Sequence, residues 1–173
     1  RSNSGYNTLA LKTDGTLWAW GVNQYGGLGQ NSISPAPNGI SSPTQIGTGT
    51  DWSDISSGSY DTTNSNIALK TNGTIWTWGD NQGGYLGQNN RTQYSSPTQV
   101  GTSTTWSTVS MGDRKAYGIK TDGTMWSWGY NTYGDLGVNN RTLYSSPTQI
   151  GTDTNWIASS LRGGHNSVTI MRS

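Results

Sequence analysis

The chain has 173 residues, a formal net charge of +1 and only 11% charged residues, and its nine acidic residues are all aspartate. No cluster of Lys and Arg is longer than Arg114-Lys115, and no apolar run approaches the ~18 residues of a membrane span, so we expect neither nucleic-acid binding nor membrane insertion. The absence of cysteine excludes disulfides and thiolate metal sites. The many Gly, Thr, Ser and Asn residues favour short strands joined by polar turns over helices.

A nine-residue motif with two tryptophans occurs three times. It reads TDGTLWAWG at 13–21, TNGTIWTWG at 71–79 and TDGTMWSWG at 121–129. Each copy is followed by a Leu-Gly pair, a Ser-Pro-Thr-Gln segment and a lone tryptophan. The underlying unit has about 50 residues, and the length differences fall in stretches rich in Gly, Ser, Asn and Pro, which are typical of loops. The sequence therefore predicts one array of repeats.

Each motif predicts a β-hairpin. An Asp-Gly or Asn-Gly pair is typical of a two-residue type I′ turn, which needs positive φ at both positions. In that register Leu11 faces Trp18 and Leu9 faces Trp20, so all four side chains share one face because side chains alternate along a strand. The predicted turn residues are Asp14, Gly15, Asn72, Gly73, Asp122 and Gly123.

Two more strands are predicted in each unit. One begins at the lone tryptophan, as in Trp52–Ser56, and the other contains the Ser-Pro-Thr-Gln segment, whose proline suits an edge strand. Four short antiparallel strands per unit are typical of a β-propeller blade, so an all-β fold is predicted. The expected repeats are 1–51, in which the first strand is missing, 52–105, 106–155 and the start of a fourth at 156–173.

The repeats resemble those of the regulator of chromosome condensation family. The resemblance rests on NTLALKTDGTLWAWGVNQYGGLGQ and its two copies, on SSPTQIG, and on the terminal GGHNSV. It implies β-propeller blades of a ring with about seven blades. The Thr/Ser/Asn-rich loops are more similar to bacterial and bacteriophage members. Because about three and a half blades leave sheet edges open, we expect further blades from a longer array or from a partner chain.

The tryptophan doublets are interpreted as core residues that pack between blades. The alternative, a platform for stacking sugars, is weaker because their register places them with Leu and Ile side chains on one sheet face. The predicted core residues are Trp18, Trp20, Trp76, Trp78, Trp126 and Trp128.

No catalytic or metal-binding pattern emerges from the sequence. His165, the one histidine, lies in RGGHNS without an orienting carboxylate nearby, and the family resemblance implies a structural role for it. GDNQGG has oxygen ligands but lacks the regularly spaced Asp and Asn residues and the closing Glu of a calcium-binding loop. We therefore expect no enzymatic activity, no cofactor and no metal.

The loops after each doublet are the predicted site, because variation and function concentrate in loops. VNQYGG, DNQGGY and YNTYGD are rich in Tyr, Asn and Gln, a composition familiar from adaptable binding surfaces, although plain solvated turns are an equal alternative. The candidate partner-binding residues are Asn23, Tyr25, Asn81, Tyr85, Tyr130, Asn131 and Tyr133.

The predicted function is non-catalytic: a rigid propeller that presents loops to a protein partner or a cell-surface glycan. The expected setting is extracellular or virion-associated, with a cytoplasmic alternative. Two other functions stay open, guanine-nucleotide exchange on a small GTPase, which the family resemblance suggests, and lectin-like carbohydrate binding.

Overall fold

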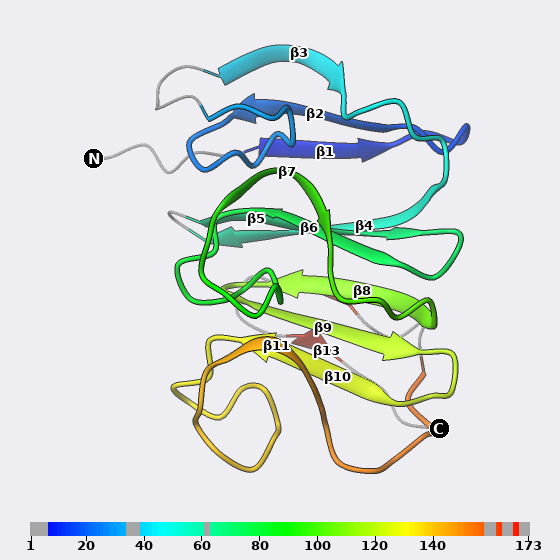
Figure 1. The fold of residues 1–173 in the computed structure, drawn as a ribbon, viewed down its shortest axis with the longest axis vertical. Helices are drawn as coiled ribbons and strands as arrows, with labels where there is room; N and C mark the ends of the chain where they lie inside the picture. The colour runs from blue at the N-terminus through cyan, green and yellow to red at the C-terminus, as the bar shows by residue number, and fades with distance from the viewer. Residues whose placement is uncertain (1–6, 34–38, 61–62, 158–161, 164–167, 170–173) are drawn as a thin grey trace.

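The computed structural model describes residues 7–33, 39–60, 63–157, 162–163 and 168–169. These residues form β-strands and no helix, and the three larger sheets lie one above another along the long axis of the molecule (Figure 1). We call the first three sheets blades 1, 2 and 3. The all-β prediction is therefore confirmed.

Each blade is an antiparallel sheet whose strands follow chain order. Blade 1 contains β1 (Asn7–Leu11), β2 (Leu17–Val22) and β3 (Gly39–Gln45). Blade 2 contains β4 (Trp52–Tyr60), β5 (Thr63–Lys70), β6 (Ile75–Gly79) and β7 (Tyr94–Gln99). Blade 3 contains β8 (Trp106–Gly112), β9 (Lys115–Lys120), β10 (Met125–Gly129) and β11 (Tyr144–Gln149). A two-stranded sheet of β12 (Arg162–Gly163) and β13 (Val168–Thr169) follows.

The proline-containing strands β3, β7 and β11 are end strands of their sheets, as the sequence predicts. A proline has no N–H to donate, and an end strand has one side on which no ladder bond is needed.

The hairpin register differs by one residue from the prediction. Leu11 pairs with Leu17, Ala10 with Trp18 and Leu9 with Ala19. Because side chains alternate, the Trp doublet lies on the opposite face from Leu9 and Leu11, and the predicted shared face is wrong. The hairpins of blades 2 and 3 have the same register.

The turn itself explains the shift. The amide of Gly15 donates to the carbonyl of Lys12 at 3.0 Å, and the amide of Lys12 donates to the carbonyl of Thr16 at 3.0 Å. The loop therefore has three residues and ends on a left-handed glycine, a known alternative to the two-residue turn. Gly15 has φ +77°, whereas the predicted positive φ at Asp14 is absent. The carboxylate of Asp14 instead accepts bonds from the amide and hydroxyl of Thr16, at 3.0 and 2.6 Å.

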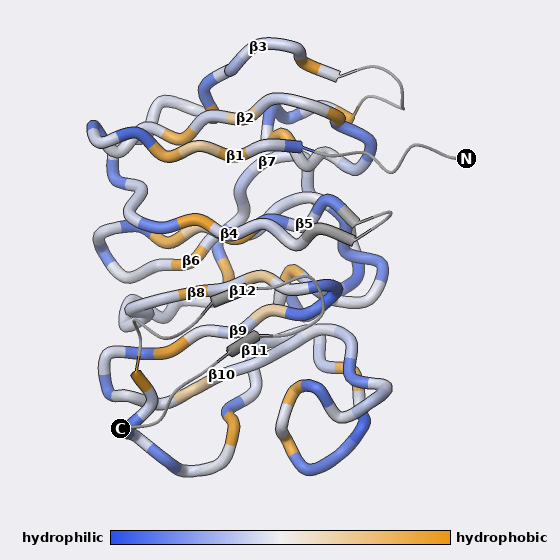
Figure 2. The backbone as a smooth tube through the Cα atoms, turned by 180° about the vertical axis from the view of Figure 1, so that it is seen from behind, coloured by the Kyte–Doolittle hydropathy of each residue, from blue (hydrophilic) through white to orange (hydrophobic). Residues whose placement is uncertain are grey.

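Both faces of blade 2 are buried against neighbouring blades. Trp78 of blade 2 packs with Leu17, Ala19 and Leu28 of blade 1. Trp128 of blade 3 packs in turn with aliphatic residues of blade 2, including Ile67. The indole N–H groups cross the same interfaces: Trp78 donates to the carbonyl of Gly27 at 3.0 Å, and Trp128 donates to the carbonyl of Tyr85 at 2.9 Å. The hydrophobic segments lie mainly along the strands, and the connecting loops are largely hydrophilic (Figure 2).

The three doublets are not equally covered. Trp78 and Trp128 are fully buried, while Trp18, Trp20, Trp76 and Trp126 are half-buried. Blade 1 is the first blade of the described stack, and no described sheet packs against its doublet face.

Candidate functional site

Three equivalent loops emerge from one end of the stacked blades. They follow β2, β6 and β10 and comprise the described residues 23–33, 80–93 and 130–143 (Figure 1, left side). We call this region the loop end. The Asp-Gly and Asn-Gly turns lie at the opposite end.

An asparagine organises each loop from inside. The side-chain carbonyl of Asn81 accepts the amide of Leu86 at 2.9 Å, and its NH₂ group donates to the carbonyls of Asn90 and Thr92 at 3.1 and 2.9 Å. Asn23 and Asn131 make equivalent bonds. All three are at most 2% exposed. These asparagines satisfy backbone groups that a tight loop would otherwise leave unpaired, and their contact with a partner stays a prediction.

The predicted tyrosines have different environments. Tyr133 is 82% exposed, Tyr25 and Tyr130 are half-buried, and Tyr85 is only 6% exposed. Burial raises the pKa of the Tyr85 phenol above its ordinary value. Tyr133 is the tyrosine best placed for contact, whereas Tyr85 is part of the loop framework.

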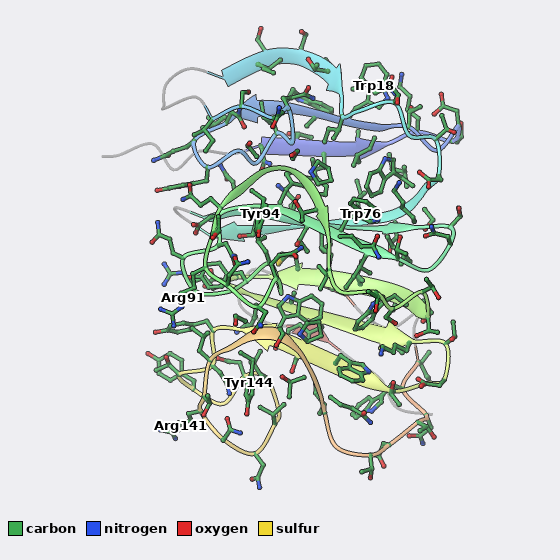
Figure 3. The ribbon with its side chains drawn as sticks, viewed as in Figure 1. Trp18, Trp76, Arg91, Tyr94, Arg141 and Tyr144 are labelled. Carbon is green, nitrogen blue, oxygen red and sulfur yellow. The ribbon has the colours of Figure 1, made fainter. Side chains whose placement is uncertain are left out.

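Two exposed arginines, Arg91 and Arg141, were missed at the sequence level. They occupy equivalent positions in the NNRT segments at 89–92 and 139–142, and this repetition was the available signal. Figure 3 shows both at the loop end, on the same side of the molecule as Tyr94 and Tyr144. Neither arginine forms an ion pair with any residue that the structure describes.

Hydrogen bonds of an asparagine side chain fix the conformation of each segment that carries an arginine. The NH₂ group of Asn90 donates to the phenol oxygen of Tyr94 at 3.0 Å, while its carbonyl oxygen accepts the amide of Thr92 at 2.8 Å. Asn140, Thr142 and Tyr144 repeat these contacts in blade 3. At the corresponding position blade 1 has Ile33, which is 52% exposed. The loop end thus combines exposed cations with exposed apolar groups on a fixed backbone.

The ionisable groups beneath this surface have structural partners. The Lys115 ammonium lies 3.3 Å from the carboxylate of Asp135. Burial raises the pKa of the Asp80 carboxyl, against the opposing effect of the Gln82 amide that donates to it. Burial also raises the pKa of Tyr117 to about 12, and its hydroxyl donates to the carbonyl of Asp135 at 2.8 Å. These contacts stabilise the base of the loops.

The described part of the chain contains no cluster of three or more His, Cys, Asp or Glu side chains that could hold a metal ion. His165 lies outside the described residues. No helix in the described ranges is long and apolar enough to cross a membrane.

The chain was compared with known proteins. It matches the family described as Regulator of chromosome condensation (RCC1) repeat at residues 14–63, 72–115 and 122–170. It is 34% identical over 87 residues to Protein RCC2 homolog of Danio rerio, a match that covers 50% of this chain and 16% of that protein.

The fold is similar to solved propellers. Prp20p of Saccharomyces cerevisiae superposes with a TM-score of 0.80 at 17% identity, covering 96% of this chain and 42% of that one. Human WBSCR16 superposes with a TM-score of 0.76 at 19% identity, with the same coverage. The chain thus spans less than half the length of these relatives, and at this identity the likeness shows the fold alone. Since the family match extends over all three blades, the chain belongs to the RCC1 repeat family.

Proposed function

We propose that this chain is a non-catalytic protein-binding module whose loop end docks a partner. The observation that carries the proposal is the combination of exposed side chains with loops held from inside by buried asparagines. A surface that is ordered before binding loses little conformational entropy when the partner arrives. Aromatic and arginine side chains are also the types most enriched in binding hot spots.

The charges suggest the chemistry of the partner. Arg91 and Arg141 are exposed, and their guanidinium groups can each form two parallel bonds to a carboxylate. We therefore propose that the partner carries acidic groups opposite the two arginines and an apolar contact opposite Tyr133. Solved relatives have protein partners: Prp20p was studied with Gsp1p and histones, and yeast RCC1 was solved bound to Kap60.

The other predicted functions have less support. Nucleotide exchange and glycan binding stay predictions, because a likeness at 17% identity carries the fold and no activity. The extracellular or virion setting, with its cytoplasmic alternative, likewise stays a prediction drawn from the character of the loops.

A site-specific photocrosslinker tests the docking surface. It is placed at Tyr133 and, as a control, at Thr152, which is exposed beyond the opposite end of β11. Cells or particles that carry the protein should yield a discrete protein adduct from position 133 and not from 152. The partner, identified by mass spectrometry and purified, should bind Tyr133→Ala or Arg91→Ala/Arg141→Ala about tenfold or more weakly in calorimetry. Equal adducts from both positions, or unchanged affinity of the variants, would refute the proposal.

A further inference from the structure

Two equivalent pockets lie between adjacent blades, and each also borders one of the loops of the loop end, at residues 29–31 and 87–89 respectively. The first has a volume of about 410 Å³ and is lined by Trp52, Lys70 and Trp76; we call it the Asp51 pocket after the residue that precedes Trp52. The second has a volume of about 400 Å³ and is lined by Trp106, Lys120 and Trp126; we call it the Thr105 pocket after the residue that precedes Trp106. The repeat thus builds the same pocket twice. In Figure 3 Trp76 lies well away from Arg91 and Arg141.

In both pockets a lysine ammonium lies over two indole rings. Lys70 is 4.7 Å from the ring centroid of Trp52 and 4.8 Å from that of Trp76. Lys120 is 5.0 Å from the centroid of Trp106 and 4.1 Å from that of Trp126. These are cation–π distances, so each ammonium is held in place by the rings.

Each pocket also contains a buried indole N–H without a hydrogen-bond acceptor. Trp52 and Trp106 are 7% and 4% exposed, and neither Nε1 has an acceptor among the residues that the structure describes. A buried donor without an acceptor is unfavourable, but the carboxylate of Asp51 does not satisfy the Trp52 N–H, so this feature is common to both pockets and does not distinguish them.

At the Asp51 pocket the lysine is already paired with a carboxylate of the chain. Asp51 Oδ1 lies 3.1 Å from the Lys70 ammonium. A Cβ atom placed on Gly49 would lie 3.2 Å from this oxygen, 3.4 Å from Trp52 Nε1 and 4.0 Å from Lys70 Nζ, so the three polar atoms converge on one point. This pocket shows where a carboxylate sits relative to the lysine and the indoles.

The Thr105 pocket has the same cation but lacks the carboxylate. Thr105 stands at the position of Asp51, and Ser103 stands at that of Gly49. Their hydroxyl groups bond to each other at 3.0 Å. Lys120 forms no ion pair with any described residue. The nearby Asp122 carboxylate is engaged by the amide and hydroxyl of Thr124.

We propose that the Thr105 pocket binds the carboxylate of a ligand, in the place that Asp51 fills in the equivalent pocket. The carboxylate accepts charge-assisted hydrogen bonds from Lys120, and a short aliphatic stem packs on Trp106 and Trp126. The volume suits a small organic acid or a single glutamate side chain. The inference does not depend on the proposed docking at the loop end, because Tyr133, Arg91 and Arg141 are not among the residues that line this pocket.

Titration of the ¹⁵N-labelled protein with butyrate tests the inference, read from the indole Nε1–H resonances assigned with Trp106→Phe and Trp126→Phe. We expect saturable shifts of both resonances with butyrate and none with butyramide. A second titration uses N-acetylglutamate amide, with its glutamine analogue as the uncharged control. Tighter binding of the glutamate compound than of butyrate would assign the carboxylate to a partner chain, and the reverse order would assign it to a free acid.

The repeat supplies matched variants. Thr105→Asp should weaken butyrate binding about tenfold or more, because the new carboxylate occupies Lys120, while Thr105→Ser should leave binding unchanged. Asp51→Thr should create a second site, seen as new shifts at Trp52 and Trp76. This gain of binding tests the proposal even if Thr105→Asp does not fold. Equal shifts with butyramide, full binding by Thr105→Asp, or no shift with either carboxylate would overturn it.

Discussion

Equivalent tryptophans of the doublets differ in what covers them. Trp78 and Trp128 are 0% exposed and donate indole bonds across a blade interface, whereas Trp20, at the same repeat position, is half-buried. The same residue type therefore occupies this position in each repeat. How much its burial contributes to the free energy of unfolding depends on whether a neighbouring blade covers it.

Alanine substitution should reveal this difference. We expect Trp78→Ala to lower the free energy of unfolding of the 173-residue chain by about 3–5 kcal/mol, because a cavity forms and the carbonyl of Gly27 loses one of the three side-chain donors that it accepts. Trp20→Ala should lower it by about 1–2 kcal/mol, since less apolar surface is removed from the core. Urea denaturation followed by circular dichroism measures both. Equal losses would mean that the doublet face of blade 1 is as well packed as that of blade 2.

The turn carboxylates should make stability depend on pH. Hydrogen bonds from Thr16 and Thr124 lower the pKa values of Asp14 and Asp122 below the ordinary 3.8. A carboxyl group whose pKa is lowered in the folded state stabilises the fold at pH values above its ordinary pKa of 3.8. This stabilisation is lost as the pH falls from 3.8 through the pKa of the folded state. Asp14→Asn/Asp122→Asn should therefore flatten the fall of the melting temperature at acidic pH.

Blade 2 supplies the matched control, because Asn72 accepts the same two bonds from Thr74 without a titratable group. Asn72→Asp should steepen the fall of the melting temperature below pH 3.8. Asp80 has a raised pKa and acts in the opposite direction, but it is common to all variants and cancels in the comparison. Unchanged profiles in both variants would show that these bonds do not hold the ionised form.

At the scale of the element, the hairpin turn also joins one blade to the next. The carbonyl of Gly73 accepts the amide of Trp106 at 3.1 Å, where β8 begins. Gly73 has φ +75°, and a Cβ there would contact the backbone carbonyl of Thr104. A glycine is therefore required at position 73 by the contact between the blades as well as by the turn.

Gly73→Ala and Gly101→Ala separate these two requirements. Gly101 has φ +58°, but a Cβ there meets nothing within 4 Å. We expect Gly101→Ala to cost about 1 kcal/mol from backbone strain alone, and Gly73→Ala to cost clearly more because the β8 segment must move. Chemical denaturation gives both values. A Gly73→Ala loss no larger than that of Gly101→Ala would argue against close contact between the turn and β8.

For the whole molecule, stacked blades resemble other repeat arrays, in which each unit is stabilised chiefly by its neighbours. Blade 2 packs between blades 1 and 3, whereas only one described blade packs against blade 1. Amide hydrogen exchange should therefore be slower in β5 and β6 than in β1 and β2, because the local opening of a central blade breaks two interfaces. Mass spectrometry of peptides from these strands measures the rates. Uniform exchange in the two blades would indicate that the stack opens as one unit.

Particular residues show which features of the fold and of the candidate site the sequence predicts and which it does not. The strand positions and the edge location of Pro43, Pro97 and Pro147 follow from local patterns. The hairpin register does not, because Asp-Gly serves both the two-residue turn and the three-residue turn with a left-handed glycine. Likewise, loop composition identifies the loop end but cannot separate the buried Asn81 from the exposed Arg91, since both are common polar loop residues.

The sequence by itself determined the repeat, the four-stranded unit and the family, because these depend on spacing and on short-range propensity. Only the tertiary structure decided which face of a blade the tryptophans occupy, which loop residues are exposed, and that Lys120 and Trp106 share a pocket without a carboxylate. The physical reason is that each of these features is produced where one blade packs against the next, between residues that are distant in the chain.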